Sequence, residues 1–411
     1  MEGNDDLKVS VIGQGYVGLP LAVLAAESGY IVTGVDVNPQ RVALINSRKS
    51  PIEDVTDQRI SQMVKIGRFE ATTNFEVIKD SQIVIICVPT PLDNQQKPDL
   101  SALKSAVNSA IPFLKEDALL INESTSFPGT LRNVIVPLVR AGYKGKKLNL
   151  SFASAPERIN PGDSIWNISN TPRIIGGIDK ESERKAYDFY SRICENVIVT
   201  SSPEVAESAK LLENTFRLVN IALINEFNQI LSRHGIDINE VVDAASTKPY
   251  GFSPFRSGVG VGGHCIPVDP IYFSSWAEDA GMKSNLVDTA NKITKSMPEF
   301  VAEKALSIAR RKVNSILILG VAYKPGTADT RETPVFDLVK TLRNRGFKVA
   351  WHDPLVKYWE GEFSVELDWP CDLVILAISQ PTIDISPILK AGIPILDCTN
   401  SYKNQEGVIP L

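Results

Sequence analysis

The sequence is poor in the residues that build metal centres and disulfide frameworks. It has three histidines in 411 residues, and they lie far apart, so a histidine-based metal cluster is not expected. The five cysteines are odd in number and widely spread, and no two form a CxxC pair, which argues against a disulfide framework and a zinc site. No metal is therefore expected. The cysteines are Cys87, Cys194, Cys265, Cys371 and Cys398.

Long apolar runs and clusters of basic residues are also missing. The longest apolar runs, such as IVIICVP, are far too short to span a bilayer, and the start MEGNDDLK resembles neither a signal peptide nor a transit peptide. No Lys/Arg block occurs, and the formal net charge is −5, which argues against a nucleic-acid partner. These absences predict a cytoplasmic protein with neither a membrane nor a nucleic acid as partner.

The sequence does contain enough apolar residues, 43% of the chain, to bury a large core, and its length suggests two or three domains. Near the N-terminus a strand, a glycine turn, a helix and a second strand follow one another in KVSVIGQGYVGLPLAVLAAESGYIVTGVDV. Strand-like runs then recur at QIVIICVPT, ALLINEST and NLSFASAPE, separated by helical stretches such as 100–114. This alternation predicts a Rossmann-like, doubly wound parallel sheet over residues 1–200.

The pattern changes after residue 200. Residues 202–235 run at helical period from a Ser-Pro start to a glycine stop, which predicts one long helix in a helical domain over 201–310. Strand alternation returns at NSILILGVAYK, FKVAWHDP, DLVILAIS and IPILDCTN, so 311–411 are predicted to form a second Rossmann-like domain without a glycine fingerprint. The expected fold class is α/β, with two doubly wound domains joined by a central helical domain.

A dinucleotide site is predicted at GQGYVG, where the glycines open a helix directly after a strand. These glycines let the backbone approach a pyrophosphate at the helix N-terminus, and Asp36, ending the next strand, can accept a bond from a ribose hydroxyl. Asp36 would repel the 2′-phosphate of NADP, so NAD is expected, although Arg41 nearby weakens that argument. The predicted cofactor-binding residues are Gly13, Gly15, Tyr16, Val17, Gly18, Asp36, Arg41, Pro89 and Thr90.

One cysteine lies in an unusual context. Cys265 sits in GVGVGGHCIPVDP, whereas the other four cysteines lie in apolar surroundings and are expected to be small buried hydrophobes. In a dinucleotide enzyme, a thiolate can add to an aldehyde, and the resulting thiohemiacetal can give up hydride to become a thioester. The glycines would leave the backbone bare, so that it could lie against a substrate. Cys265 is thus a candidate nucleophile, and a buried thiol is the alternative.

The sequence resembles the UDP-glucose/GDP-mannose dehydrogenase family along nearly its whole length. The resemblance rests on GQGYVGLPLA, VPTPL, ESTSFPGT, APERINPG, ESAKLLENTFR, GVGVGGHCIPVDP and GVAYKPGTADTRETP, in the family's order and spacing. It implies two Rossmann-like domains joined by a helical middle, whose long helix forms a homodimer. It also implies oxidation of a sugar C6 alcohol to the carboxylate with two NAD⁺ and one water. A two-electron β-hydroxyacid-type dehydrogenase and a non-catalytic nucleotide-sensing Rossmann protein are the alternatives.

The resemblance also implies a set of catalytic residues. Cys265 matches the nucleophile, and Lys210 and Asn214 match residues that hold the reacting oxygen; positions four apart on a helix share a face, so both could point at one oxyanion. Glu157 matches a glutamate that assists thioester hydrolysis. Thr125 and Asp269 match residues that hold a water near the reacting carbon.

Substrate contacts follow from the same comparison. Arg331 is expected to reach the cofactor from the C-terminal domain, and the diphosphate is a plausible partner for the ammonium of Lys324. Arg158 could bind an acetamido group or could pair with an acid. A basic residue that reaches the partner subunit's site is expected near Lys248. The predicted substrate-binding residues are Arg158, Lys210, Asn214, Lys248, Phe252, Phe255, Gly262, Tyr323 and Lys324.

Two departures from the UDP-glucose pattern bear on the sugar. UDP-glucose enzymes read CLPKD after the nucleophile and have a second glutamate four residues after the first, whereas Val268 and Pro161 stand at these positions here. The sequence therefore resembles the branch that oxidises UDP-N-acetylhexosamines, with UDP-N-acetylglucosamine expected. UDP-N-acetylmannosamine, UDP-N-acetylgalactosamine and UDP-glucose remain as alternatives.

Overall fold

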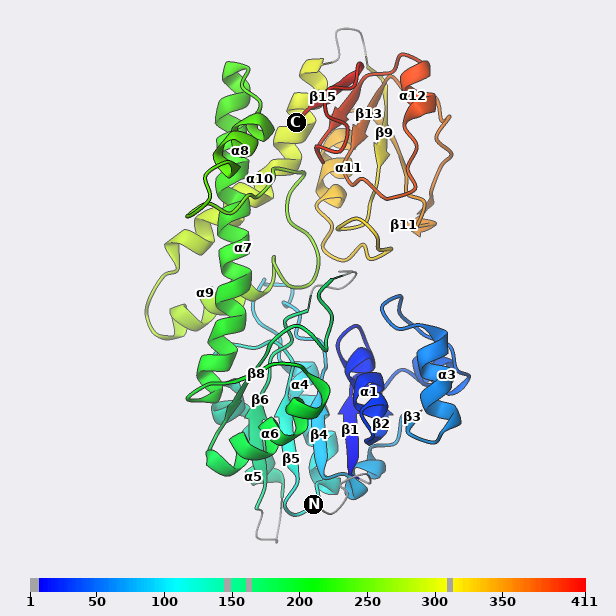
Figure 1. The fold of residues 1–411 in the computed structure, drawn as a ribbon. Coiled ribbons are helices and arrows are strands. Elements are labelled where there is room, and N and C mark those ends of the chain that lie inside the picture. Colours follow the sequence, from blue (N-terminus) through cyan, green and yellow to red (C-terminus); the bar gives the residue numbers. More distant parts are fainter. Residues whose placement is uncertain (1–6, 144–148, 160–164, 309–312) are drawn as a thin grey trace. The chain divides into compact units, whose positions relative to one another are not determined.

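The computed structural model describes residues 7–143, 149–159, 165–308 and 313–411. By the density of its internal contacts the chain divides into two compact units, Met1–Glu213 and Asn214–Leu411. Each unit contains its own sheet (Figure 1). The central helices and the C-terminal sheet thus fall in one unit, and the predicted division into three domains stays a prediction.

In the first unit, eight described strands form one sheet in the order β3-β2-β1-β4-β5-β6-β7-β8. Strands β1 to β6 pair in parallel, in the order of a doubly wound dinucleotide-binding sheet, which confirms the predicted fold class. Strand β7 pairs antiparallel with β6, a reversal that the alternation of elements did not reveal. The strands are β1 (Lys8–Ile12), β2 (Ile31–Val35), β3 (Phe69–Thr72), β4 (Ile83–Ile86), β5 (Leu119–Asn122), β6 (Ser151–Ser154), β7 (Arg173–Gly177) and β8 (Val197–Val199).

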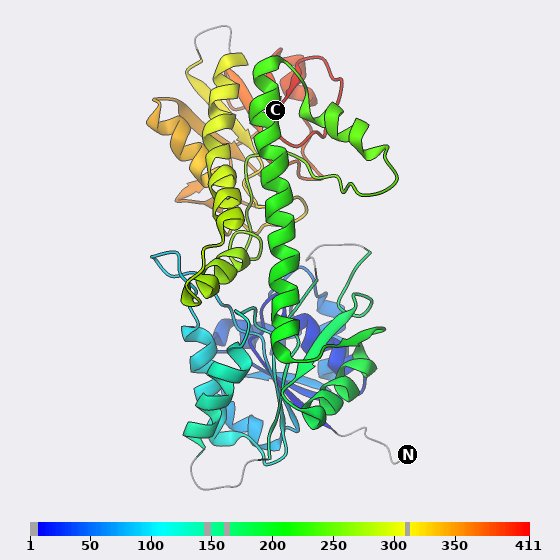
Figure 2. The same ribbon diagram turned by 90° about the vertical axis from the view of Figure 1, so that its left-hand side faces the viewer.

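Helices cover both faces of this sheet. One face packs on α1 (Gly18–Glu27), α3 (Asp57–Lys65) and α6 (Lys180–Ile193), which share a single apolar core with the strands. Figure 2 shows α4 (Ser101–Ala110) and α5 (Val136–Gly142) together on the other side. Strands β4 and β5 are therefore buried at every residue, as expected for a parallel sheet that is covered twice.

Helix α7 is the long helix that the sequence predicts. It runs over Pro203–Leu231, with proline in its first turn, and ends in one 3₁₀ turn at Ser232–His234. Gly235 follows with φ of 71°, in the left-handed region that favours glycine at a helix end. The predicted Ser-Pro start and glycine stop are both confirmed. The boundary between the two units falls inside this helix.

In the second unit, three more helices follow the end of α7: α8 (Ile238–Ser246), α9 (Asp269–Asp279) and α10 (Asn285–Ile308). Helix α10 packs on α7 through a small apolar cluster that includes Leu218 and Val287. Nearer its C-terminal end, α10 joins the core of the adjoining sheet. None of the helices in the described residues is both long and apolar enough to cross a bilayer.

The sheet of the second unit has the order β10-β9-β13-β14-β15 and is parallel throughout. Helix α11 (Val335–Asn344) shares the α10 side of the core, and α12 (Ser386–Lys390) packs on the opposite face. The strands are β9 (Ser315–Leu319), β10 (Lys348–His352), β13 (Leu373–Leu376), β14 (Ile395–Asp397) and β15 (Val408–Pro410). Strand β15 and the short hairpin of β11 (Tyr358–Trp359) and β12 (Glu362–Phe363) were not predicted, because such short segments carry little periodicity.

Candidate active site

The glycine turn after β1 fits a bound dinucleotide. A Cβ on Gly13 would lie 2.4 Å from the carbonyl oxygen of Cys87, and one on Gly18 would lie 1.8 Å from the carbonyl oxygen of Gly13. Both glycines are therefore required by the protein's own backbone. A Cβ on Gly15 would meet no protein atom within 4 Å, so this glycine leaves open space at the start of α1, where a pyrophosphate approaches the helix N-terminus.

Asp36, directly after β2, completes this predicted site. Its carboxylate is 4% exposed and accepts hydrogen bonds from the amides of Gln14 at 2.7 Å and Asn38 at 2.8 Å. Arg41 donates to the same carboxylate at 2.9 Å. The guanidinium of Arg41 is thus paired with Asp36, the carboxylate that would repel the 2′-phosphate of NADP. This pairing agrees with the expected preference for NAD over NADP.

The loops after β4 and β5 are tied together beside this site. The hydroxyl of Ser124 donates to the carbonyl of Val88 at 2.8 Å and accepts from its amide at 3.0 Å. In the adjoining residues, Thr90 is buried, Pro89 is exposed and Thr125 is half-buried. These bonds hold the predicted cofactor residues and Thr125 at the same sheet edge, the carboxyl ends of parallel strands.

Sequence reasoning missed a buried carboxylate that binds the loop after Thr125. Glu207 on α7 is 2% exposed and accepts hydrogen bonds from the amides of Gly129 at 2.6 Å and Leu131 at 3.1 Å. Burial raises the pKa of Glu207 to about 7, although the two amides act in the opposite direction. Glu207 therefore fastens the loop that carries Thr125 to the helix that carries Lys210.

Glu157 is held at several points. One carboxylate oxygen accepts from the amides of Arg158 at 2.6 Å and Ile159 at 2.7 Å, and the other accepts from Arg173 at 2.8 Å. Burial acts to raise the pKa of Glu157, but Arg173, the Ile159 amide and the ammonium of Lys210 lower it below its ordinary value. The buried Lys210 and Glu157 are thus brought together in the first unit, as a joint catalytic role requires.

Arg158 is engaged by the protein itself. Its guanidinium forms an ion pair of 2.6 Å with Glu213 on α7 and donates to the carbonyl of Pro172 at 2.7 Å. The pairing with an acid is thus present, and the other alternative, binding of an acetamido group, stays a prediction. Pro161, in the same loop, lies outside the described residues.

In the second unit, Cys265 is exposed, whereas Cys87, Cys194 and Cys398 are buried and Cys371 is half-buried. The prediction that the other four cysteines are buried is thus confirmed for three of them. Cys371, close to the start of β13, is only partly covered.

The glycines before Cys265 face the protein's own chain. A Cβ on Gly262 would lie 2.8 Å from the carbonyl oxygen of Glu332, and one on Gly263 would lie 2.7 Å from the ring of Tyr323. The amide of Gly263 also donates to the carbonyl of Arg331 at 3.1 Å. The absence of side chains at these glycines therefore allows the loop to pack on residues 323–334. The sequence had suggested that the bare backbone would lie against a substrate.

The two ends of the Cys265 loop are anchored on α7. At the start, Asn225 accepts from the hydroxyl of Ser257 at 3.0 Å, and Asn228 donates to the same hydroxyl at 2.9 Å. At the end, Asn214 donates to the carboxylate of Asp269 at 2.5 Å. Asn225 and Asn228 are fully buried, and sequence reasoning missed them because asparagines in a helix carry no distinctive signal.

Asp269 also bonds directly to the chain at the cysteine. Its amide donates to the carbonyl of Cys265 at 2.8 Å, and Asp269 itself opens α9. The predicted residues Asn214, Cys265 and Asp269 are therefore linked by consecutive hydrogen bonds. This arrangement brings an amide, a thiol and a carboxylate into one part of the second unit.

The strand-end segment after β9 contributes further predicted residues. Lys324 places its ammonium 5.5 Å from the centre of the Tyr323 ring. Arg331 pairs with Asp329 at 2.6 Å, and its side chain is half exposed. Burial and the charge of Arg331 lower the pKa of His264, so this histidine next to Cys265 is neutral at pH 7.

The remaining predicted substrate residues have ordinary surroundings. Phe255 contacts Phe216 on α7, with ring centres 6.0 Å apart, and packs on a small apolar cluster with α8. Phe252 is 37% exposed. The ammonium of Lys248 lies over the Tyr250 ring at 4.9 Å. A role for these three in substrate binding stays a prediction.

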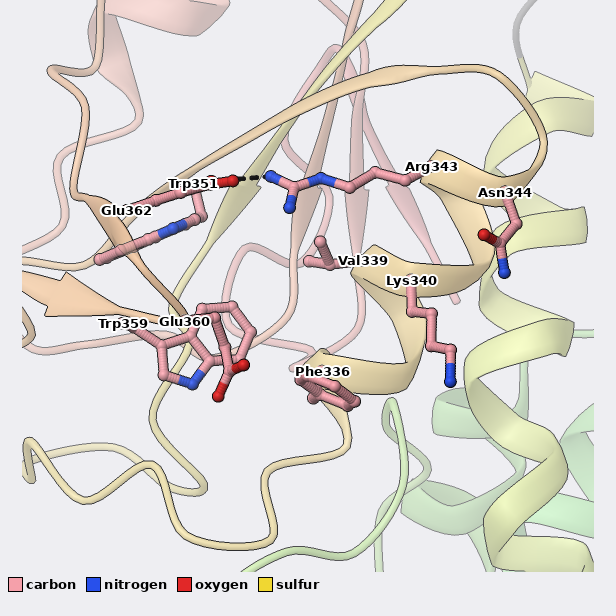
Figure 3. A pocket seen from close by; sticks show the side chains of 9 residues that line it. All are labelled: Phe336, Val339, Lys340, Arg343, Asn344, Trp351, Trp359, Glu360 and Glu362. Carbon is pink, nitrogen blue, oxygen red and sulfur yellow. Dashed lines mark hydrogen bonds and ion pairs between the residues drawn. The ribbon is translucent and has the colours of Figure 1, made fainter.

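A pocket of about 280 Å³ lies in the second unit at the edge strand β10 (Figure 3). One side is the face of α11 that carries Arg343, which donates to Glu362 of the hairpin at 2.8 Å. Its lining residues are Phe336, Val339, Lys340, Arg343, Asn344, Trp351, Trp359, Glu360 and Glu362. These include none of the predicted site residues.

The predicted residues therefore form two groups, one in each unit. The first group combines a dinucleotide-binding turn with Thr125, Glu157 and Lys210, and the second combines Asn214, Cys265 and Asp269 with the segment around Tyr323. A doubly wound fold with this turn and an exposed cysteine in a tightly packed loop defines a dinucleotide-dependent oxidoreductase that contains a candidate thiol nucleophile.

Comparison with known proteins names the family. Residues 7–194 match the NAD-binding domain, 204–296 the central domain and 317–383 the UDP-binding domain of the UDP-glucose/GDP-mannose dehydrogenase family. The chain belongs to this family. It is thus an NAD-dependent dehydrogenase of UDP-sugars, and the expected cofactor, substrate class and reaction class are confirmed at that level.

Two curated relatives and one solved structure illustrate the similarity. The chain is 35% identical to the UDP-N-acetyl-D-mannosamine dehydrogenase of Pyrococcus horikoshii, with 91% of this chain and 90% of that protein covered. It is 34% identical to the UDP-N-acetyl-D-glucosamine 6-dehydrogenase of Pseudomonas aeruginosa, with 85% and 83% covered. A solved structure of the Pyrococcus horikoshii UDP-D-ManNAc dehydrogenase matches with a TM-score of 0.89 and 33% identity, with 98% of each chain covered.

Proposed function

We propose that this protein oxidises the C6 alcohol of a UDP-N-acetylhexosamine to the carboxylate, in a four-electron reaction through a thioester on Cys265. The observation that carries the proposal is the hydrogen-bonded series Asn214–Asp269–Cys265, which adjoins an exposed thiol in a rigidly packed loop. A two-electron dehydrogenase of the β-hydroxyacid type needs no such thiol.

Each residue then has a defined task. The oxidising power would come from two NAD⁺ molecules, bound one after the other at the glycine turn, each of which would take one hydride from C6. Thr125 and Asp269 hold the water that receives the hydroxyl proton, and the Cys265 thiolate forms a carbon–sulfur bond with the resulting aldehyde. Lys210 and Asn214, four positions apart on α7, stabilise the negative oxygen of the adduct.

Thioester hydrolysis completes the reaction. Water adds to the thioester carbon and passes a proton to Glu157, whose carboxylate is ionised because Arg173 and two backbone amides hold it. The carbon–sulfur bond breaks, and its electron pair returns to Cys265 as thiolate. Both protons of the attacking water reach solvent, one of them through Glu157, so the product leaves as the uronate, Glu157 is ionised again and Cys265 is again a thiolate.

The sugar follows from the sequence and from the names of the relatives. Val268 and the resemblance to the N-acetylhexosamine branch favour UDP-N-acetylglucosamine over UDP-glucose. UDP-N-acetylmannosamine is the second candidate, because several relatives of nearly equal similarity are named for it. We place the reaction in the cytoplasm, where NAD⁺ and nucleotide sugars are available.

A homodimer through α7 is part of the proposal. Four apolar residues of α7 in the second unit, spaced by seven, four and three positions, are 46 to 55% exposed: Phe216, Leu223, Phe227 and Ile230. This spacing forms one stripe along the helix, and a second copy of the chain could bury it.

The direct test is the number of NADH molecules released per sugar. The purified protein is incubated with excess NAD⁺ and a limiting amount of one UDP-sugar. Four such reactions are run, with UDP-N-acetylglucosamine, its manno epimer, its galacto epimer and UDP-glucose. We expect two NADH per sugar with one N-acetylhexosamine, and no turnover with Cys265→Ala. One NADH per sugar would indicate a two-electron enzyme, and Cys265→Ala turnover at the wild-type rate would exclude the thioester.

A further inference from the structure

Glu157 contacts a buried set of charged and polar side chains that take no direct part in the proposed chemistry. Glu123 follows β5 directly, Arg173 is the first residue of β7, and Tyr190 lies on α6; each of these residues is at most 3% exposed. Arg173 donates to Glu157 at 2.8 Å and to Glu123 at 3.3 Å. The hydroxyl of Tyr190 donates to the other oxygen of Glu123.

One guanidinium is therefore shared by two carboxylates at a site that is almost fully buried. Burial raises the pKa of Glu123 to about 7, against the effect of Arg173, and the charge of Glu157 raises it further. By contrast, Arg173 and the Ile159 amide outweigh burial and lower the pKa of Glu157. Below about pH 7 the proton of the pair thus resides on Glu123, whereas Glu157 stays ionised.

The other groups that face this pair do not change charge in the same range. Burial raises the pKa of the thiols of Cys87 and Cys194 and of the Tyr190 phenol, so these groups stay neutral. Lys210 is the remaining charge that acts on Glu157. Glu123 is therefore the group whose ionisation changes the field at Glu157 near neutral pH.

We propose that Arg173 and Glu123 are positioning residues for Glu157: Arg173 orients the carboxylate, and the proton on Glu123 sets how strongly Arg173 withdraws charge from it. When Glu123 is protonated, Arg173 interacts with Glu157 alone, and Glu157 is a weak base. When Glu123 ionises, the guanidinium is divided between two carboxylates, and Glu157 becomes more basic. Hydrolysis of the thioester should accordingly accelerate as the pH rises through about 7. This inference rests on the proposed role of Glu157.

The test separates the hydride steps from hydrolysis. Stopped-flow absorbance follows formation of the two NADH, and rapid quenching follows release of the uronate, both in single turnovers between pH 6 and pH 8.5. In the wild type we expect uronate release to rise about tenfold across this range. Glu123→Gln keeps the shape of the side chain but cannot ionise, so its uronate release should vary by less than twofold, with KM and both NADH steps unchanged.

Two further variants make the result specific. Glu207→Gln removes another buried carboxylate of the first unit with a pKa of about 7, whose hydrogen bonds come from the amides of Gly129 and Leu131 and not from Arg173, and it should keep the pH dependence of the wild type. Arg173→Lys keeps the charge but lacks the planar fork whose two nitrogens reach the two carboxylates, so uronate release should slow at least tenfold while the NADH steps persist. A merely structural Glu123 would instead lower all rates by a constant factor at every pH.

The outcomes distinguish this inference from the proposed function. An unchanged pH dependence in Glu123→Gln, or its loss in Glu207→Gln, overturns the inference while two NADH per sugar still support the four-electron reaction. If Glu157→Gln releases uronate at the wild-type rate, the proposed role of Glu157 is wrong, and the inference is overturned with it.

Discussion

Asn214 donates a hydrogen bond of 2.5 Å to the carboxylate of Asp269, and the amide of Asp269 donates to the carbonyl of Cys265 at 2.8 Å. Asn214 lies on α7, whereas Asp269 is the first residue of α9. The carboxylate therefore joins α7, which carries Asn214, to the loop that contains Cys265. From this link we expect Asp269 to align its two neighbours.

Asp269→Asn should slow the reaction without unfolding the protein. The variant places an amide opposite the amide of Asn214 and removes a charge-assisted hydrogen bond, which contributes about 1.5–3 kcal/mol. We expect kcat to fall by about 10- to 100-fold, with a change in the KM for UDP-sugar of less than threefold. Asp279→Asn, at the exposed C-terminal end of the same helix, should behave like the wild type. Equal effects of the two substitutions would remove Asp269 from the site.

The Cys265 loop supplies a second prediction, which separates close packing from backbone strain. Gly263 and Gly281 have nearly the same positive φ, 83° and 73°, but only Gly263 faces a neighbour, the Tyr323 ring, at 2.7 Å. An alanine costs about 1 kcal/mol of stability at either site because of the left-handed backbone. Gly263→Ala must also displace the loop from Tyr323.

We therefore expect Gly263→Ala to lose at least tenfold in kcat/KM, whereas Gly281→Ala keeps its activity despite a similar drop in Tm. Steady-state kinetics and thermal unfolding of both variants provide the comparison. If Gly281→Ala were as inactive as Gly263→Ala, general strain and not the contact with Tyr323 would explain the effect.

Much of the fold was predictable because its signals are local. The glycine turn, the strand ends and the Ser-Pro start of α7 each depend on a few adjacent residues, and the structure confirms them. The antiparallel strand β7 could not be predicted in the same way, since strand direction depends on pairing with β6, and 18 residues of sequence separate the two strands.

The supporting residues of the site were less accessible to sequence reasoning. Arg173 contacts a carboxylate 50 positions away, and Glu207 bonds to amides 76 and 78 positions away. Residues so far apart in the sequence form no local pattern from which these contacts could be predicted. A single arginine within the apolar run PRIIGG was the one available signal, because a charge at the start of a buried strand needs a partner.

The apolar stripe of α7 leads to a prediction about assembly. If a second copy covers Phe216, Leu223, Phe227 and Ile230, a charge in the middle of the stripe should separate the copies, because burying an unpaired carboxylate is costly. We expect the wild type to be a dimer by light scattering after gel filtration and Phe227→Asp to be a folded monomer. Leu286→Asp, an equally apolar exposed position on α10, should stay dimeric. A monomeric wild type would rule out this interface.

Glu207 gives a prediction for stability, and its sign follows from the direction of the pKa shift. Burial raises the pKa of Glu207 to about 7 in the folded state, whereas the ordinary value for glutamate is 4.5. Between these two values the folded state binds more proton than the unfolded state, so the free energy of unfolding falls as the pH rises. The contribution is complete below pH 4.5 and is lost as the pH rises through 7.

Relative to Glu207→Gln, the wild type should therefore lose about 3 kcal/mol of unfolding free energy between pH 4.5 and pH 8. Glu204, one turn earlier on α7, is the matched control with the opposite sign. Burial acts to raise its pKa, but the ion pair with Arg132 lowers it, so the stability from Glu204 is lost only as the pH falls. Urea unfolding of the wild type, Glu207→Gln and Glu204→Gln at several pH values measures both slopes. A difference between wild type and Glu207→Gln that stays constant with pH would mean that Glu207 is ionised in the folded protein throughout, and that its two amide hydrogen bonds outweigh its burial.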